Sequence, residues 1–226
     1  IGTLRILEAV KENFPNAKYY QASSSEMFGN SSGMKNEDTI LKPRSPYGAA
    51  KVFAHHMTNH YREAYNLFAC CGILFNHESP LRGIEFVTRR ITWNLARIKY
   101  SKTTKFSLGN IHAKRDWGFA GDFVEAMWLM LQQEKPDDYV IATGESHTVE
   151  EFLTLATEYA GLGDWHDFVE IDESILRPTD IDELLGDSSK AKSLLKWKPK
   201  LSFKDLVKEM VQHDLEYFKL RLDAFD

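Results

Sequence analysis

The sequence contains little cysteine, and this limits the kinds of site that it can build. Cys70 and Cys71 are its two cysteines among 226 residues, and they are adjacent in an apolar stretch. Neighbouring cysteines form a disulfide only with strain, so we interpret them as reduced thiols in the core of a cytoplasmic protein. They are too few for a zinc site, and no histidine stands beside them at a metal-like spacing. The other histidines, including His55, His56 and His60, form no metal-binding pattern in the sequence.

Long hydrophobic runs and an excess of positive charge are also missing. No apolar run approaches the roughly 20 residues that a membrane-spanning helix needs, and no secretory signal is visible. The formal net charge is −5, which gives no sign of a general nucleic-acid binder. We therefore expect a cytoplasmic protein with neither nucleic acid nor membrane among its partners. A chain of 226 residues can bury a sizeable core as one domain, or as one domain with a lobe.

Hydrophobic spacing predicts strands that alternate with helices along most of the chain. The predicted helices cover residues 3–13, 47–66, 86–100, 122–133, 149–160, 188–195 and 203–222. The predicted strands cover residues 17–22, 67–75, 105–108, 139–143 and 168–171. This alternation predicts an α/β fold with a mainly parallel sheet, and a smaller second lobe after about residue 105. We expect Trp117, Trp128 and Trp197 to pack inside the protein.

Four residues form a candidate acid/base group around the start of the second predicted helix. Tyr47 and Lys51 are four residues apart, which places both on one face of a helix. A nearby ammonium favours the phenolate form of a tyrosine, so Tyr47 is a candidate general base. Glu26 adds a second proton-transfer group, and Ser24 adds a hydroxyl that can hold a substrate oxygen. On spacing alone, a Tyr/Lys pair is more often part of a solvated helix face.

The order of the elements places these groups at the edge of the sheet where ligands are expected. Open parallel sheets bind ligands beyond the carboxyl ends of their strands. Residues 23–26 follow one predicted strand, and residues 76–80 follow the next. Both segments are therefore expected at the same edge.

Longer sequence words carry a resemblance to a known family. Tyr-x-x-x-Lys preceded by Ser-Ser-Ser-Glu resembles the extended short-chain dehydrogenase/reductases. The words that resemble the GDP-mannose 4,6-dehydratases in particular are PRSPY (43–47), GILFNHESP (72–80), FVTR (86–89), KRDWG (114–118), WLMLQQ (128–133), Arg177-Pro178 and WKP (197–199). They cover essentially the whole chain in order, and together they are far more specific than Tyr-x-x-x-Lys alone.

The resemblance implies a lyase that uses tightly held NADP and takes GDP-mannose as its substrate. Tyr47 would take the proton of the sugar 4-hydroxyl while hydride leaves C4 for the nicotinamide. Glu26 would remove the C5 proton, water would leave from C6, and hydride would return to C6. The product is GDP-4-keto-6-deoxymannose, on the route to GDP-fucose and related deoxysugars. Ser24, where threonine is common, would hydrogen-bond the sugar O4, and Tyr47 and Lys51 would also contact the cofactor.

The resemblance implies further contacts and an oligomer. His77 and Arg82 would contact NADP, although the family usually has two arginines where this chain has Leu81-Arg82. The implied substrate contacts are Asn76, Val87, Arg90, Gly109, Asn110, Arg115, Arg177 and Asp180. Arg90 stands where lysine is common, and Asp180 where glutamate is common. The full-length protein would be a homodimer or homotetramer.

The same resemblance refines the expected fold to a partial Rossmann-like, doubly wound parallel sheet with a smaller C-terminal substrate-binding lobe. Residues 1–104 would form a partial NADP-binding domain that carries the catalytic residues. Residues 105–226 would form mainly the substrate-binding lobe, with elements that return to the main domain. No G-x-G-x-x-G or G-x-x-G-x-x-G word occurs, so we expect the pyrophosphate cradle and roughly the first third of the family fold to lie outside this chain.

Two hypotheses about function follow. In the first, the chain is part of a GDP-mannose 4,6-dehydratase, either as a partial chain or as one half of a split protein. In the second, it is a non-catalytic remnant that keeps a nucleotide-sugar pocket or a subunit interface. Another nucleotide-sugar epimerase or dehydratase is the alternative within the class. Glu26 argues against an epimerase, because simple 4-epimerisation needs no proton removal from C5.

Overall fold

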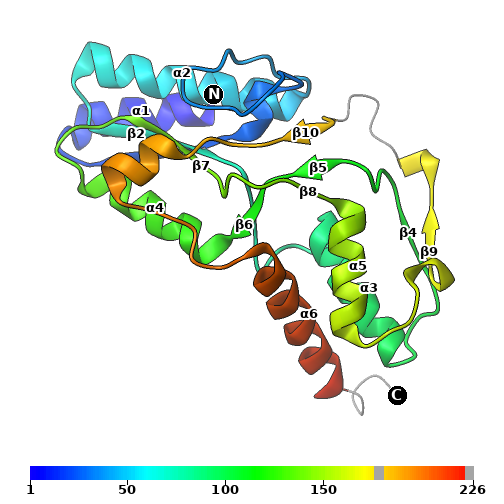
Figure 1. Ribbon diagram of the computed structural model, residues 1–226. Coiled ribbons are helices and arrows are strands. Elements are labelled where there is room, and N and C mark those ends of the chain that lie inside the picture. The colour runs from blue at the N-terminus through cyan, green and yellow to red at the C-terminus, as the bar shows by residue number, and fades with distance from the viewer. Residues whose placement is uncertain (176–180, 222–226) are drawn as a thin grey trace.

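The computed structural model describes residues 1–175 and 181–221 and is built around a parallel sheet. The strands of this sheet, in the order β1-β2-β7, are β1 (Tyr19–Ser24), β2 (Ala69–Leu74) and β7 (Asp138–Ile141). Figure 1 shows α1 (Gly2–Asn13) and α2 (Pro46–Tyr65) on one side of these strands and α4 (Ala120–Gln132) on the other. Helices on both faces of a parallel sheet are the doubly wound arrangement that the alternating pattern predicts.

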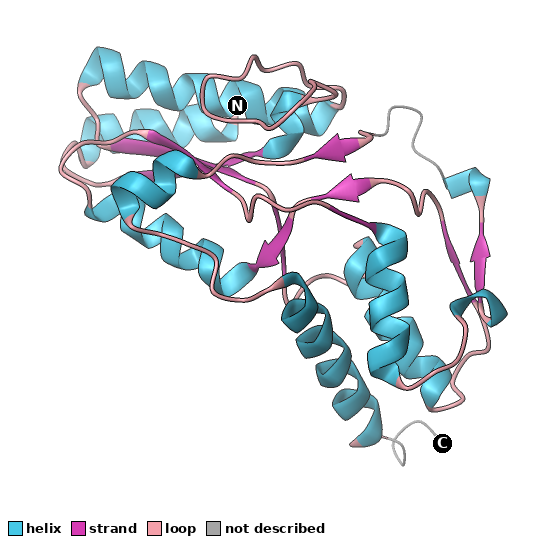
Figure 2. Cartoon of the chain, viewed as in Figure 1, coloured by secondary structure: helices cyan, strands magenta, loops and turns pink. Residues whose placement is uncertain are grey.

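A second group of elements packs beside the central sheet. Its helices, which lie together in Figure 1, are α3 (Val87–Lys99), α5 (Val149–Ala160) and α6 (Phe203–Lys219). Short strands, visible in Figure 2, form pairs and a small sheet: β3 (Asn76–Glu78) with β6 (Trp117–Phe119), β4 (Phe106–Leu108) with β9 (Val169–Ile171), and β10 (Glu183–Leu184), β5 (Lys114–Arg115) and β8 (His147–Thr148). The short helices are η1 (Ser25–Phe28), η2 (Trp165–Asp167), η3 (Glu173–Ile175) and η4 (Ala191–Leu195).

Buried side chains form two large hydrophobic cores. The first lies around the central sheet and α4 and includes Phe75, Phe123 and Trp197. The second lies among α3, α5 and α6 and includes Trp117 and Phe152. The predicted boundary between residues 104 and 105 stays a prediction.

Asp122, at the start of α4, joins the two cores. Its Oδ2 accepts hydrogen bonds from the backbone N of Lys200 at 2.8 Å and of Leu201 at 3.2 Å. The indole Nε1 of Trp197 donates to the Asp122 carbonyl oxygen at 2.7 Å. The chain that leads from the first core into α6 is therefore attached to α4.

Most predicted elements form within a few residues of their expected bounds, but two expectations were wrong in detail. Trp128 does not pack inside the protein, because it lies on the outer face of α4 and is 61% exposed. The helix predicted over residues 188–195 begins beside Asp187, whose carboxylate accepts from Ser189 N at 2.9 Å. It then widens into a π-helix over Ala191–Leu195. Within residues 1–175 and 181–221, none of the helices combines the length and apolar character needed to span a bilayer.

Candidate active site

The carboxyl end of β1 carries the serine and the carboxylate that the sequence analysis selected. Ser24 is the last residue of β1, and its Oγ accepts a hydrogen bond from the backbone N of Glu26 at 3.2 Å. A serine here ends the strand and caps η1, because its hydroxyl satisfies an amide that has no helical partner. Glu26 is half-buried, whereas Met27 and Phe28 after it are fully buried. The core therefore anchors the turn that holds Glu26.

The start of α2 presents Tyr47 at the surface. Ser45 caps the helix with its Oγ accepting from Gly48 N at 3.0 Å. Pro46 follows in the first helical turn, where its lack of an N–H leaves no hydrogen bond unmade. These two residues set the helix start, so Tyr47 falls in the first turn, where its side chain is 55% exposed. An exposed phenol at this point can reach a bound ligand.

Lys51 lies one turn further along α2 and is fixed against β1. Its Nζ donates a hydrogen bond to the Ala22 carbonyl oxygen at 2.8 Å and lies 5.6 Å from the centroid of the Tyr47 ring. A Cβ at Gly48 would lie 2.9 Å from the Glu26 carbonyl oxygen, so only glycine allows this close approach of α2 and η1. Together these contacts bring all four predicted catalytic residues to the carboxyl end of β1.

The register of the central sheet aligns the ends of its strands. Ser24 pairs with Leu74 on β2, and Leu74 pairs with Ile141 on β7. The three strands therefore end at one edge, as expected of a parallel sheet that binds ligands there. Asn76 and His77, which follow β2, lie in β3 just beyond this edge.

His77 is held as a neutral imidazole. Its Nδ1 lies 2.9 Å from the Phe75 carbonyl oxygen, so Nδ1 carries the hydrogen because a carbonyl can only accept. The ring stacks on Phe123, with centroids 5.0 Å apart, and burial lowers the pKa of His77. Nε2 is then a hydrogen-bond acceptor near neutral pH.

The Arg82 guanidinium is stacked and lies beside a buried carboxyl group. It lies 3.6 Å from the centroid of the Phe86 ring, and its Nε lies 3.4 Å from Glu78 Oε2. Glu78 is almost completely buried, and its Oε2 accepts a hydrogen bond from Thr88 Oγ1 at 2.6 Å. Burial raises the pKa of Glu78. Phe86 and Glu78 thus restrict where the cation of Arg82 can point.

Arg115 and Asp116 form hydrogen bonds to neighbouring loops near this edge of the sheet. Arg115 donates to the Ile181 carbonyl oxygen at 2.7 Å. Asp116 is fully buried. Its carboxylate accepts hydrogen bonds, 2.7 to 3.3 Å long, from Thr143 N, Thr143 Oγ1, Gly144 N and Gly186 N. One side chain therefore ties β5 to the segments that follow β7 and β10.

Comparison with known proteins settles the family. The family model described as GDP-mannose 4,6 dehydratase matches residues 1–210. The chain belongs to this family. It is 62% identical over 222 residues to GDP-mannose 4,6 dehydratase 1 of Arabidopsis thaliana, which covers 96% of this chain and 61% of the relative. It is 47% identical over 245 residues to human GDP-mannose 4,6 dehydratase, covering 99% of this chain and 65% of the relative. The chain thus spans about three fifths of the length of the first of these GDP-mannose 4,6 dehydratases.

Solved structures agree with the fold. RMD from Pseudomonas aeruginosa, complexed with NADPH, matches with a TM-score of 0.86 at 20% identity, over 96% of this chain and 72% of the other. The dTDP-glucose 4,6-dehydratase of Bacillus anthracis str. Ames, in complex with NAD, matches with a TM-score of 0.86 at 24% identity, over 97% and 68%. The predicted α/β, Rossmann-like class is therefore confirmed.

The other residues that resemble the dehydratase family's substrate contacts lie in the second group of elements. Val87 and Arg90 are in the first turn of α3, and Gly109 and Asn110 directly follow β4. Asn110 Oδ1 accepts from His112 N at 3.0 Å. Arg177 and Asp180 lie outside the described residues.

Two buried carboxyl groups lie in sequence segments that resemble the dehydratases but were not predicted as site residues. Asp116 lies in KRDWG and Glu78 in GILFNHESP, each beside a residue that was selected. The available signal was an acidic residue next to a selected one, Arg115 or His77. Their contacts show that both organise neighbouring groups at the edge of the sheet.

Proposed function

We propose that this chain carries the catalytic groups of a GDP-mannose 4,6-dehydratase. Membership of the family supports the reaction. The observation that carries the proposal is the meeting of Ser24, Glu26, Tyr47 and Lys51 at the carboxyl end of β1, with Lys51 Nζ bonded to the Ala22 carbonyl oxygen. A phenol and a carboxyl group at one site provide the two proton transfers that dehydration of a hexose requires.

The residues around this edge fit a nicotinamide cofactor, and we propose NADP. The Lys51 ammonium has three donors and gives one to Ala22, so it can also bind the hydroxyls of a ribose. The stacked Arg82 suits a phosphate, since guanidinium pairs with phosphate through parallel hydrogen bonds. The cofactor, when bound, takes a hydride from the sugar and later returns it. Structural neighbours that contain NADPH or NAD support this class of cofactor.

The chain's own residues would handle the protons. Tyr47 accepts the proton of the sugar 4-hydroxyl, while the Ser24 hydroxyl holds O4. Glu26 removes the C5 proton, which the new 4-keto group acidifies, and passes it to the C6 hydroxyl, which leaves as water. C5 regains a proton when the hydride returns to C6, and this balances the proton that Tyr47 took from the 4-hydroxyl. The product is GDP-4-keto-6-deoxymannose, a precursor of GDP-fucose and related deoxysugars.

The remaining assignments are part of the same proposal. His77 would join Arg82 in binding the cofactor. We assign the nucleotide sugar to Asn76, Val87, Arg90, Gly109, Asn110, Arg115, Arg177 and Asp180. We further propose a division into residues 1–104 and 105–226, a cytoplasmic location, and a homodimer or homotetramer for the full-length protein.

Product analysis tests the proposal. The 226-residue chain, and the same chain joined to a glycine-rich βαβ segment of the kind that its own sequence lacks, are incubated with NADP and GDP-mannose. We expect the joined chain to release one water per sugar, detected by mass spectrometry, and the shorter chain to bind NADP weakly with little activity. A product of unchanged mass with an inverted C4 would instead identify an epimerase. Binding of GDP-mannose without turnover by the joined chain would identify a non-catalytic remnant.

A further inference from the structure

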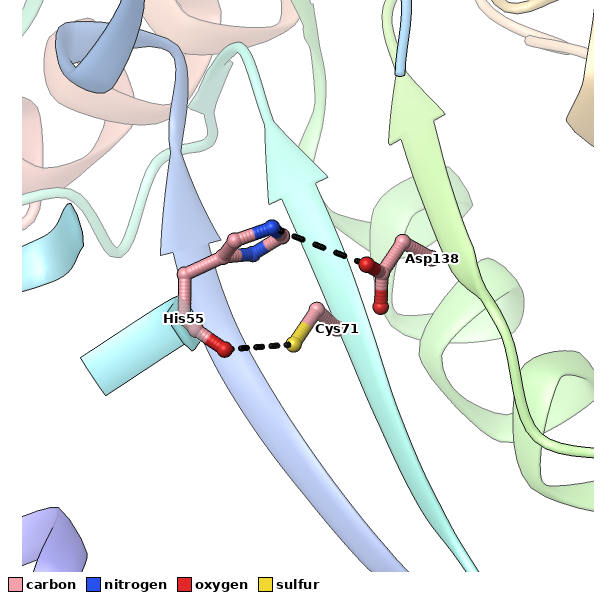
Figure 3. Close-up of side chains that lie close together, drawn as sticks. All are labelled: His55, Cys71 and Asp138. Atoms are coloured by element: carbon pink, nitrogen blue, oxygen red, sulfur yellow. Dashed lines mark hydrogen bonds and ion pairs between the residues drawn. The ribbon is translucent and has the colours of Figure 1, made fainter. Parts of the chain in front are cut away.

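A buried cluster of polar side chains lies between α2 and the central sheet. Figure 3 shows His55, Cys71 and Asp138 pointing toward one another, and one nitrogen, sulfur or oxygen atom of each lies within 4.8 Å of those of the other two. Cys71 and Asp138 are register partners on the parallel strands β2 and β7, so their side chains share a face of the sheet. The helix α2 covers this face and contributes His55, which is 6% exposed. The helix that begins beside Tyr47 is therefore attached to the sheet through buried groups.

Asn59 and Arg62 close this cluster and hold the Asp138 carboxylate. The Asn59 amide nitrogen donates to Asp138 Oδ2 at 2.9 Å, and Arg62 donates hydrogen bonds of 2.8 and 3.2 Å to the two carboxylate oxygens. The same amide nitrogen lies 3.4 Å from His55 Nε2, whereas Asp138 Oδ2 lies 3.6 Å from it, too far for a hydrogen bond. An amide nitrogen only donates, so the nearer partner of His55 Nε2 is a donor.

The other imidazole nitrogen of His55 reaches the end of β1. Nδ1 lies 3.1 Å from Ser23 Oγ, and Ser23 is 4% exposed. Because Nε2 faces a donor, the hydrogen of the neutral ring is on Nδ1, and Nδ1 donates it to the serine hydroxyl. Burial lowers the pKa of His55, which keeps the ring neutral near neutral pH. This hydrogen bond joins α2 to the strand residue directly before Ser24.

His55 lies one turn after Lys51, so α2 is bonded to consecutive residues of β1 at consecutive turns. Lys51 Nζ donates to the Ala22 carbonyl oxygen at 2.8 Å, and His55 donates to Ser23. Successive side chains of a strand point to opposite faces, so Ser23 faces α2 whereas Ser24 does not. The hydroxyls of a ligand compete for the Lys51 ammonium, but the bond between His55 and Ser23 is buried away from any ligand.

We propose that His55 is a positioning residue, which sets the distance between Tyr47 on α2 and Ser24 at the end of β1. This inference rests on the proposed function, which assigns both of those residues to the sugar 4-hydroxyl. Tyr47 lies eight residues before His55, about two turns of α2, and a helix transmits a shift at one turn to the others. Misplacement of reacting groups by about 1 Å can slow a reaction by about 100-fold. His55 therefore contributes to the rate without touching either ligand.

Turnover of the joined chain tests this role. His55→Phe keeps a ring but cannot donate to Ser23, so we expect kcat to fall by roughly 10- to 100-fold while the KM for GDP-mannose stays nearly unchanged. His55→Asn, which puts an amide near the place of Nδ1, should recover part of the loss. Ser23→Ala combined with His55→Phe should be no slower than His55→Phe alone, because both changes remove the same bond. Thr58→Val is the matched control, since Thr58 is fully buried on the same helix and its hydroxyl bonds within α2, to the Ala54 carbonyl oxygen at 2.9 Å.

The control separates positioning from stability. We expect Thr58→Val to lower the free energy of unfolding but to leave kcat of the folded enzyme unchanged. Equal kcat of folded His55→Phe and wild type would overturn the proposal, as would losses that add in the double variant. If His55→Phe does not fold, Ser23→Ala removes the same hydrogen bond by a smaller change. Absence of product from the wild-type joined chain would instead refute the proposed function.

Crystal structures of the 226-residue chain test the geometry without any turnover. We expect Tyr47 to lie further from Ser24 in His55→Phe, or in Ser23→Ala, than in the wild type and Thr58→Val. An unchanged distance between Tyr47 and Ser24 would overturn the proposal at any level of activity.

Discussion

The ammonium nitrogen of Lys51 lies 5.6 Å from the centroid of the Tyr47 ring and donates a hydrogen bond to the Ala22 carbonyl oxygen at 2.8 Å. One residue of α2 is thereby fixed to the strand whose end carries Ser24, so the helix and the strand present their polar groups together. Lys51→Met removes this hydrogen bond and the charge beside the phenol. In the chain joined to a glycine-rich segment, we expect turnover to fall at least about 100-fold, the usual range for a lost acid/base group. Steady-state product formation measures this, and Lys42→Met, an exposed lysine of the preceding loop, is the control.

Glu26→Gln separates the first oxidation from water loss. The amide keeps the size of the side chain but cannot remove the C5 proton, so we expect no dehydrated product and preserved oxidation at C4. Reduced cofactor is followed by its absorbance in a single turnover, and product by mass spectrometry. Glu63→Gln, on the exposed side of α2, should leave both unchanged. Normal yield of the 4-keto-6-deoxy product from Glu26→Gln would show that another group removes the proton.

Gly48→Ala tests the close approach of α2 and η1. The added Cβ would lie 2.9 Å from the Glu26 carbonyl oxygen and 3.0 Å from Pro43 Cβ, so the backbone must shift. We expect a loss of roughly 1–3 kcal/mol in the free energy of unfolding, as for other overpacked sites. Turnover of the joined chain should also fall, because Tyr47 moves relative to Glu26. Gly163→Ala, whose Cβ meets nothing within 4 Å, is the matched control in urea unfolding.

Asp116→Asn tests the carboxylate that binds the segments after β7 and β10. Each carboxylate oxygen of Asp116 accepts two of the four hydrogen bonds, and an amide keeps one acceptor oxygen, so two of the four are lost. We expect the free energy of unfolding to fall by about 2–4 kcal/mol, as for other broken buried networks. Urea unfolding measures the loss. Asp38→Asn, at an exposed position, should change stability little, and equal stability of the two variants would contradict the prediction.

Glu78 should make stability depend on pH. Burial raises its pKa above the ordinary value of 4.5, so above that pH the folded chain holds a proton that the unfolded chain has lost. The free energy of unfolding therefore falls as the pH rises from 4.5 through the folded pKa. Glu78→Gln removes the titration while the amide oxygen can still accept from Thr88. We expect the wild type to lose stability relative to Glu78→Gln across this range, measured by urea unfolding at successive pH values. Parallel curves would show that Glu78 ionises normally.

The sequence predicted those helices and strands whose positions depend on the spacing of neighbouring residues. The strand ending at Ser24 and the helix beginning near Tyr47 follow from periodicity and capping, which act within a few residues. The meeting of His55, Cys71 and Asp138 could not be predicted, because it depends on the register of β2 with β7, whose partners are far apart in the sequence. The exposure of Trp128 was missed for a related reason: an aromatic residue in an apolar helix can point to either side, and only packing decides. The roles of the candidate catalytic residues stay predictions.

The attachment of residues 200 and 201 to Asp122 has a mechanical consequence. The chain passes from the first core to the second at a point held by two hydrogen bonds to one carboxylate and by a third to the indole of Trp197. The Asp116 carboxylate makes a second attachment, because it accepts hydrogen bonds from Thr143 N, Gly144 N and Gly186 N. Movement of one core against the other must break hydrogen bonds at both places, so the two cores are braced against each other.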